Sequence, residues 1–307
     1  MSIEVKNVFK YYGEQAALND VSFSVKQGEI VGFLGPNGAG KSTMMKIITC
    51  FLPKSEGEVR VCGLDVVNDS LEVRKIIGYL PEHNPLYLDM YIKEYLDFVA
   101  GIYKIKNKKE RIAEMIALVG LEKEQNKKIG ALSKGYRQRV GLAQAMIHNP
   151  DVLILDEPTT GLDPNQLAEI RQLIVNIGKT KTVMLSTHIM QEVEAICDRV
   201  IIIKDGSIVA DDTTTHIQQG ADEKQTIFVE FDKEFSRNAL SKINGVLSVN
   251  NLEGNQWLFV SKTSDIRSNI AKFAQQNDLL VLAMRVEEKS MEEVFKALTN
   301  NLNTTKK

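Results

Sequence analysis

Short apolar runs alternate with amphipathic stretches through most of the chain, which is the pattern of a layered α/β fold. Ile3 and Val5, and later Val21, Phe23 and Val25, alternate with polar neighbours, and this alternation predicts strands. Glu29–Leu34 and Asp151–Leu155 are nearly continuous apolar runs of strand length, typical of strands buried on both faces. Helix, strand, helix and strand follow through Ile203, so we expect a mostly parallel sheet.

Helical spacing is clearest in the middle of the chain. Between Ile92 and Val119 the apolar residues lie three and four positions apart, which predicts helices. The lysine-rich stretch Lys104–Arg111 interrupts them and is predicted to be a solvated connection. We also expect a helix over Ser42–Phe51 and a hairpin turn at residues 204–207.

After about Gln219 the pattern changes, and a second domain of residues 219–307 is expected to follow a first domain of residues 1–218. The predicted elements are strands 226–231, 246–253, 256–261 and 279–286, and helices 235–243, 266–276 and 291–298. The order β-α-β-β-α-β with a trailing helix favours a small ferredoxin-like α+β module.

Composition excludes several classes of protein. A chain of 307 residues exceeds what one core usually fills, which agrees with two domains. Thirty-eight basic and 40 acidic side chains leave a net charge of −2, so the sequence has no electrostatic footprint for duplex nucleic acid, and no nucleic-acid partner is expected. The three cysteines are an odd number for a disulfide framework and are expected to be reduced.

The chain is not expected to enter a membrane by itself. The first residues lack a basic segment followed by an apolar one, so no secretory signal is predicted. No stretch runs 18 apolar residues without charges. Any action at a membrane would therefore require a separate membrane protein.

A glycine-rich loop follows the first buried strand and matches the pattern G-x-x-x-x-G-K-[ST]. Its residues are Gly35, Pro36, Asn37, Gly38, Ala39, Gly40, Lys41, Ser42 and Thr43. Glycines let successive backbone N–H groups point at a phosphate chain, and the following helix adds the positive end of its dipole. Lys41 would contact the outer phosphates and Ser42 would bind Mg²⁺. The alternative is a plain strand-to-helix turn that matches by chance.

Two carboxylates end the second buried strand. Asp156 and Glu157 emerge at its carboxyl end, where ligand sites of α/β proteins lie. Asp156 suits Mg²⁺, and Glu157 is positioned to deprotonate a water attacking a terminal phosphate. His188 follows the predicted strand Thr182–Leu185 and could lie at the same edge. The alternatives are a solvated strand end and a structural histidine.

A third segment has the character of an anion site. Ser133 stands at an N-cap position before an amphipathic helix, where a serine and free helix N–H groups can bind an anion. It lies 18 positions before Asp151, however, and nothing local brings it to the other motifs. A plain helix start is the alternative.

Together these motifs resemble the nucleotide-binding subunit of an ABC transporter over residues 1 to about 210. In that family's terms, residues 35–43 resemble the Walker A loop, 132–136 the signature, 152–157 Walker B and 160–163 the D-loop, while His188 resembles the switch histidine and Tyr12 the aromatic residue that stacks on adenine. The resemblance implies a P-loop ATPase domain with a mixed sheet and a helical subdomain of about residues 85–150.

The resemblance also implies cofactors, partners and roles. ATP and Mg²⁺ would be the cofactors, with Glu157, His188 and Lys41 in catalysis. Two copies would pair head to tail, so that Ser133 and Gly135 of one contact the γ-phosphate bound by the other, with Asp163 of the D-loop also at the nucleotide. Separate transmembrane permease subunits are implied, with this protein in the cytoplasm, peripheral on the inner membrane.

One position departs from the family pattern. Glu82 occupies the place of the usual Q-loop glutamine, and its carboxylate can also bind Mg²⁺. Subunits of ABC-2 type exporters resemble this form, and residues 82–91 look closest to gliding-motility-associated ATP-binding subunits of Bacteroidetes. The apolar residues that follow Glu82 are expected near a coupling helix of the membrane subunit, or else in the core of the helical subdomain. They are Pro85, Leu86, Tyr87, Leu88 and Met90.

Two further alternatives stay open. The chain could be an ABC-type ATPase that acts on a soluble macromolecular partner, such as a ribosome or chromosome. One Walker A loop and the 92 positions between Lys41 and Ser133 fit neither type well. The second domain could stabilise a dimer or regulate the ATPase, whereas its aromatic residues could simply fill its core.

Overall fold

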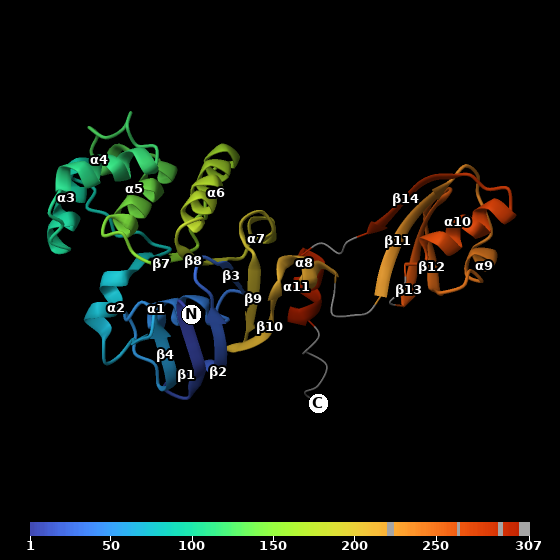
Figure 1. The fold of residues 1–307 in the computed structure, drawn as a ribbon, viewed down its shortest axis with the longest axis horizontal. Helices are drawn as coiled ribbons and strands as arrows, with labels where there is room; N and C mark the ends of the chain where they lie inside the picture. The colour runs from blue at the N-terminus through green and yellow to red at the C-terminus, as the bar shows by residue number, and fades with distance from the viewer. Residues whose placement is uncertain (220–223, 263–264, 288–290, 301–307) are drawn as a thin grey trace. The chain divides into compact units, whose positions relative to one another are not determined.

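The computed structural model describes residues 1–219, 224–262, 265–287 and 291–300 (Figure 1). The chain divides into an N-terminal unit, Met1–Thr214, and a C-terminal unit, Thr215–Lys307. In the described residues, no helix combines the length and the apolar character that crossing a membrane requires.

The central sheet of the N-terminal unit has the strand order β10-β9-β3-β8-β7-β6. Its strands are β3 (Ile30–Leu34), β6 (Ile77–Leu80), β7 (Val152–Asp156), β8 (Thr182–Thr187), β9 (Arg199–Lys204) and β10 (Ser207–Thr213). All neighbours are parallel except β9 and β10, which form the predicted hairpin. The strands β3, β7 and β8 are buried along their whole length, which confirms the two buried strands predicted from apolar runs.

A second, antiparallel sheet has the order β2-β1-β4-β5. It consists of β1 (Ile3–Tyr12), β2 (Gln15–Val25), β4 (Glu56–Val61) and β5 (Leu64–Asp65). The alternation at residues 3–5 and 21–25 correctly predicted strands there, which are parts of β1 and β2. One apolar core, including Val5 of β1, Met44 of α1 and Ile154 of β7, joins both sheets. The core thus fixes the loop before α1 against the central sheet.

Helices cover the central sheet and extend from it. They are α1 (Lys41–Ile48), α2 (Ser70–Ile76), α3 (Ile92–Ile102), α4 (Lys108–Leu118), α5 (Lys134–Met146), α6 (Pro164–Gly178) and α7 (Met190–Ile196), with a 3₁₀ turn at Ile129–Ala131. The α8 helix (Thr214–Gln219) begins at the boundary between the two units. The helix predicted to reach Phe51 ends at Ile48, because Cys50 adopts a left-handed backbone with φ of 59°.

The α3, α4 and α5 helices pack together at one end of the N-terminal unit (Figure 1). The predicted connection Lys104–Arg111 is wrong in its second half, where residues 108–111 form the first turn of α4. The physical reason is visible at Arg111, whose guanidinium donates to the carbonyl oxygens of Met146 and Ile147 at the end of α5. These hydrogen bonds hold the first turn of α4 against α5, although its charged residues alone predicted a solvated connection.

The C-terminal unit contains an antiparallel sheet of strand order β12-β13-β11-β14, and the helices α9 and α10 contribute to its core. Its elements are β11 (Lys224–Phe231), α9 (Arg237–Leu240), β12 (Val246–Glu253), β13 (Gln256–Lys262), α10 (Arg267–Gln276), β14 (Val281–Glu287) and α11 (Met291–Asn300). The predicted element order is confirmed, although α9 is shorter than the expected helix 235–243. The aromatic residues Phe231, Trp257 and Phe259 fill the core, as the simpler interpretation held.

Candidate active site

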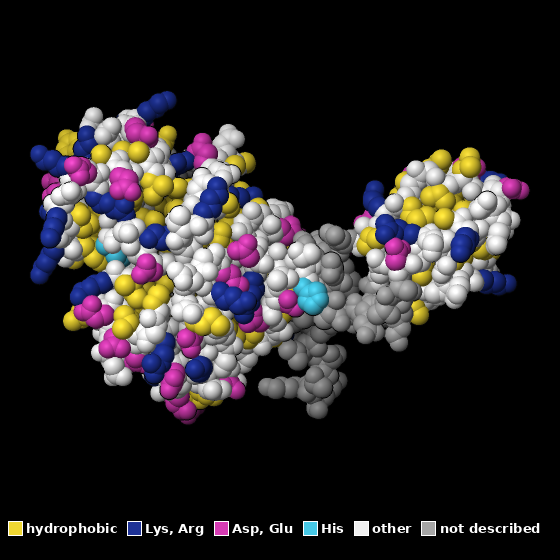
Figure 2. Space-filling view, viewed as in Figure 1, with side chains coloured by type: hydrophobic (Ala, Val, Ile, Leu, Met, Phe, Trp, Pro, Cys, Tyr) yellow, Lys and Arg dark blue, Asp and Glu magenta, His cyan; other side chains and the backbone are white. Residues whose placement is uncertain are grey.

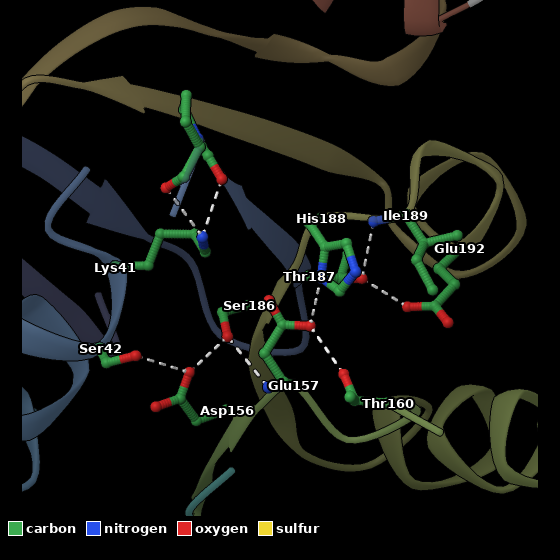
Figure 3. A network of polar contacts seen from close by, with 12 residues as sticks. Lys41, Ser42, Asp156, Glu157, Thr160, Ser186, Thr187, His188, Ile189 and Glu192 are labelled. Carbon is green, nitrogen blue, oxygen red and sulfur yellow. Dashed lines mark hydrogen bonds and ion pairs between the residues drawn. The ribbon is translucent and has the colours of Figure 1, made fainter. Parts of the chain in front are cut away.

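The ends of three neighbouring strands form one polar network at the carboxyl edge of the central sheet (Figure 3). The strand β3 leads into the glycine loop, residues 35–43, while β7 ends at Asp156 and β8 ends just before His188. Because these strands are parallel and adjacent, motifs more than 100 residues apart in the chain meet at this edge.

The glycine loop has the backbone that its sequence predicts. Gly38 and Gly40 have φ values of 81° and 111°, which favour glycine. A Cβ on Gly40 would also lie 2.7 Å from the carbonyl oxygen of Ala17. The loop can therefore curl closely enough for its N–H groups to surround a phosphate chain.

Lys41 curls back over this loop. Its Nζ donates to the carbonyl oxygens of Gly35 at 2.7 Å and Pro36 at 3.2 Å. Burial lowers the pKa of Lys41, and the nearby carboxylates, Glu157 first, oppose that shift. A buried cation that faces carboxylates across the site is well suited to an anionic ligand.

Asp156 joins the glycine loop to the neighbouring strand. Its carboxylate, only 2% exposed, accepts hydrogen bonds at Oδ1 from Ser42 Oγ at 3.2 Å and Ser186 Oγ at 2.6 Å. Two of the three residues expected to bind Mg²⁺, Ser42 and Asp156, are thus in direct contact although they belong to separate motifs.

Glu157 is held on both its backbone and its side chain. Its N–H lies within hydrogen-bond distance of Ser186 O at 3.2 Å and Ser186 Oγ at 3.0 Å. Its Oε2 accepts from Thr160 Oγ1 at 3.0 Å and lies 2.8 Å from His188 Nδ1. The backbone φ of 52° is left-handed, a conformation that costs a non-glycine residue about 1–3 kcal/mol and concentrates at functional sites.

Sequence reasoning missed the hydroxyl groups in this network. Ser186 bridges Asp156 and Glu157, and Thr160 holds the carboxylate of Glu157. The signal that could have found them is the pair Ser186-Thr187 at the end of a buried strand, since buried hydroxyls need partners and carboxylates lie on the next strand.

The donor set fits magnesium and a nucleotide. Within the described ranges, no group of three or more His, Cys, Asp or Glu side chains is arranged to hold a metal. Mg²⁺ is usually held by one or two carboxylates together with substrate phosphates, and the oxygens of Ser42 and Asp156 beside a phosphate-binding loop match that mode.

Glu82 lies farther from this pair. It is exposed, and within the residues described it makes no hydrogen bond to Ser42 or Asp156. Tyr79 has a buried hydroxyl without a hydrogen-bond partner in the described structure. Burial raises the pKa of Tyr79, and the charges of Asp156 and Glu82 raise it further. The charge of Glu82 also opposes the lowering of the Lys41 pKa, so Glu82 is related to the glycine loop through charge and not through a hydrogen bond in the described residues.

Ser133 caps α5, as predicted, and accepts a hydrogen bond from the N–H of Tyr136 at 3.4 Å. In the part of the chain that the structure describes, no hydrogen bond links Ser133 to the glycine loop. Gly135 instead packs on α6, where a Cβ would lie 2.5 Å from Gln166 Oε1. Within one copy of the chain, the signature is a separate surface.

Asp163 and Tyr12 lie outside the polar network. Asp163 caps α6, since its Oδ1 accepts from the N–H groups of Asn165 and Gln166 at 3.0 Å. Tyr12 ends β1 with its side chain half exposed, and Lys10 Nζ lies 5.3 Å from the centre of its ring. An exposed ring is available for stacking, so the structure is compatible with the role expected for Tyr12.

The apolar residues after Glu82 form a surface pocket. It is lined by Leu86, Tyr87, Leu88, Asp89, Met90 and Phe98. The Tyr87 side chain is 56% exposed and packs edge-on against the rings of Tyr95 and Phe98. The alternative that Tyr87 lies in the core of the helical subdomain is therefore wrong. Figure 2 shows apolar side chains among charged ones at the end of the N-terminal unit where α3, α4 and α5 pack.

Comparisons with known proteins agree with this geometry. A family model described as "ABC transporter" matches residues 18–160. The ABC transporter ATP-binding protein YhcH of Bacillus subtilis (strain 168) is 33% identical over 311 residues, covering 97% of this chain and 95% of that protein. The bacitracin transport ATP-binding protein BcrA of Bacillus licheniformis is 31% identical over 297 residues, covering 95% of each. A solved structure described as a dimeric post-hydrolysis state of the ATP-binding cassette MJ0796 bound to ADP and Pi has a TM-score of 0.62 and 31% identity, covering 69% of this chain and 98% of that one.

Proposed function

Because the chain belongs to the ATP-binding proteins of ABC transporters, in which ATP hydrolysis is coupled to transport, we propose that it energises an exporter of the ABC-2 type. The observation that supports this most strongly is the single network that links Ser42, Asp156, Glu157 and His188 at the sheet edge. The relative BcrA, a bacitracin transport protein by name, supports the exporter class.

Each residue of the network has a role in this proposal. The glycine loop binds the phosphates of ATP with its N–H groups, and Lys41 binds the outer ones. Ser42 and Asp156 hold Mg²⁺, which when bound neutralises charge on the phosphates, while Glu82 assists through its field. Glu157 takes the proton from the attacking water, and His188 keeps the carboxylate of Glu157 oriented.

The second half of the proposal is a head-to-tail homodimer. Ser133 and Gly135 lie on a surface separate from the glycine loop of the same copy, so a second copy is needed to bring them to the γ-phosphate. Asp163 then reaches the nucleotide region from the N-cap of α6, and Tyr12 stacks on adenine. The dimer described for MJ0796 supports this arrangement.

We propose that the pocket around Tyr87 is the docking site for the membrane subunit. The exposed Tyr87 and Leu88 offer an apolar surface to a transmembrane permease subunit, which would hold the protein at the cytoplasmic face of the membrane. Tyr87→Glu is expected to abolish assembly with the permease while ATP binding persists. Leu71→Glu, which adds the same charge at an exposed leucine of α2, is the matched control. Unimpaired assembly of Tyr87→Glu would exclude this surface.

Two finer assignments complete the proposal. The segment 82–91 supports a link to gliding motility, for which loss of gliding in cells that carry only Glu157→Gln is the test.

The strand order of the C-terminal unit supports a ferredoxin-like module that stabilises the dimer or regulates hydrolysis. Deleting residues 221–307 and measuring ATP-dependent dimerisation tests that role.

The decisive experiment replaces Glu157 by Gln. The amide keeps the size of the side chain but cannot take a proton, so we expect retained ATP binding, loss of turnover and a more stable ATP-bound dimer. Glu72→Gln, an exposed change on α2, is the control. If Glu157→Gln hydrolysed ATP at the original rate, Glu157 would not be the base.

A further inference from the structure

A buried carboxylate lies directly behind the His188 loop. Glu192, in α7, has no exposed surface, and its Oε2 accepts a hydrogen bond from Thr187 Oγ1 at 2.6 Å. The oxygen of the same hydroxyl accepts from the N–H of Ile189 at 3.1 Å. The residues on the two sides of His188 are therefore bonded to each other through one hydroxyl, which Glu192 holds in place (Figure 3).

Packing does not account for an acidic residue at this position. Thr187 is also fully buried, and in the described structure Glu192 Oε1 has no hydrogen-bond partner. An unpartnered buried oxygen costs about 1–3 kcal/mol, more when it is charged, and an apolar side chain of similar size would avoid that cost. The carboxyl group is thus explained by what its other oxygen does, which is to hold Thr187.

The helix that carries Glu192 is packed tightly against the central sheet. The α7 helix lies on β3, where a Cβ built on Gly32 would be 3.1 Å from Cys197 Sγ and 3.4 Å from Val193 Cγ1. Val193 follows Glu192 in the same helix and is fully buried. Glu192 is therefore anchored to the central sheet, and through Thr187 it transmits that anchoring to the His188 loop.

We infer that Glu192 and Thr187 form a clamp that positions His188 against Glu157. The clamp fixes the backbone on both sides of His188, so that Nδ1 stays 2.8 Å from Glu157 Oε2. Neither clamp residue touches the reacting atoms, so both are positioning residues. The inference rests on the proposed function of Glu157 as the catalytic base.

The test compares three variants of the full chain in steady-state ATPase assays. Thr187→Val keeps the shape but loses the hydroxyl, and we expect kcat to fall about 10- to 100-fold while the KM for ATP stays nearly constant. Thr187→Ser restores the hydroxyl and should recover most of kcat. Glu192→Gln still offers Thr187 an acceptor and should keep kcat within about three-fold, since the bond rather than the charge matters.

Thr159→Val is the matched control. Thr159 is 1% exposed near the same sheet edge, and its Oγ1 has no hydrogen-bond partner in the described residues, so this variant should keep kcat. A Thr187→Val variant with unchanged kcat would overturn the clamp. So would a loss of kcat that Thr187→Ser fails to recover, because the effect would then come from packing.

A second readout does not depend on turnover. The chain has four histidines, so the ring nitrogens of His188 can be assigned by NMR of ¹⁵N-histidine-labelled protein with a His188→Gln reference. Thr187→Val should shift the Nδ1 signal of His188, and Thr159→Val should not. An unmoved signal overturns the clamp even if Glu157 is the base. A shifted signal supports the clamp even if Glu157→Gln retains full activity and the proposed role of Glu157 fails.

Discussion

Thr160 Oγ1 donates a hydrogen bond to Glu157 Oε2 at 3.0 Å, and His188 Nδ1 lies 2.8 Å from the same oxygen. Two side chains from different loops therefore fix one oxygen of this carboxylate. Because the backbone of Glu157 is also held by Ser186, the carboxylate has a defined direction before any substrate binds. Such preorganisation is what a general base requires.

Replacing Thr160 by Val tests this arrangement. The variant keeps the shape of the side chain but removes one bond to Glu157, worth about 0.5–1.5 kcal/mol and more when the acceptor is charged. We expect kcat for ATP hydrolysis to fall about ten-fold, with the ATP dissociation constant unchanged. Steady-state assays and equilibrium nucleotide binding measure the two quantities.

Thr160→Ser supplies the comparison, because it retains the hydroxyl and should retain most of the activity. If Thr160→Val weakened ATP binding as strongly as it lowered kcat, Thr160 would contact the nucleotide rather than orient Glu157.

Glu82→Gln is expected to remain active. The carboxylate lies outside direct contact with Ser42 and Asp156, and an amide oxygen can still approach a magnesium ion. The Mg²⁺ concentration for half-maximal ATPase activity should rise, because one negative charge near the site is removed. A magnesium titration of both proteins measures this. A completely inactive Glu82→Gln would show that the carboxylate has a task of its own.

The parts of the site that could be predicted are those set by local sequence. The glycine loop needs only a buried strand, its glycines and the following helix, and Asp156 and Glu157 need only the apolar run before them. The bond between Ser42 and Asp156 joins residues from β7 and the loop after β3, and these strands are separated in the sheet by β8. The strand order, which depends on the whole core, is what brings them together.

Other features could not be read from local patterns. The hydroxyl of Ser186 acquires a role only because β8 lies beside β7. Tyr87 has the same apolar character as core residues, and its exposure depends on how the segment folds over Tyr95 and Phe98. The role proposed for Ser133 depends on a second copy of the chain, and patterns within one copy do not reveal such a contact.

The contact between Asn84 and α5 gives a prediction about stability. A Cβ on Gly141 would overlap Asn84 Nδ2 and lie 2.6 Å from Leu80 Cδ1. Asn84 also donates to the carbonyl oxygen of Arg137 at 3.4 Å. Gly141→Ala should therefore destabilise the protein by about 1–3 kcal/mol through overpacking, less the helix preference of alanine. Thermal and urea unfolding measure the change.

Asn84→Ala should partly rescue Gly141→Ala, because it removes the atoms that overlap. Gly101→Ala in α3 is the matched control, since the nearest atom to its Cβ would be the flexible end of Lys108 at 3.2 Å. Additive effects of the two changes at Gly141 and Asn84 would refute the contact.

The burial of the His148 ring predicts that the stability of the fold depends on pH. Its ring stacks on Tyr103 with centres 4.0 Å apart, and Nε2 lies 2.9 Å from the carbonyl oxygen of Ile77. Burial lowers the pKa of His148 below its usual 6.5, the bond to Ile77 opposes this, and the charges of Arg111 and Lys181 lower it further. The buried Nδ1 has no hydrogen-bond partner among the described residues, so a proton there would be unsatisfied.

The lowered pKa of His148 determines how the free energy of unfolding changes with pH. A histidine whose pKa is lower in the folded state takes up a proton more readily when unfolded, so its contribution is complete above pH 6.5 and is lost as the pH falls below it. The wild type should therefore lose more unfolding free energy than His148→Gln between about pH 8 and about pH 5. His83→Gln, at an exposed position, should follow the wild type. Parallel curves for the wild type and His148→Gln would mean that the pKa of His148 is the same in the folded and the unfolded protein.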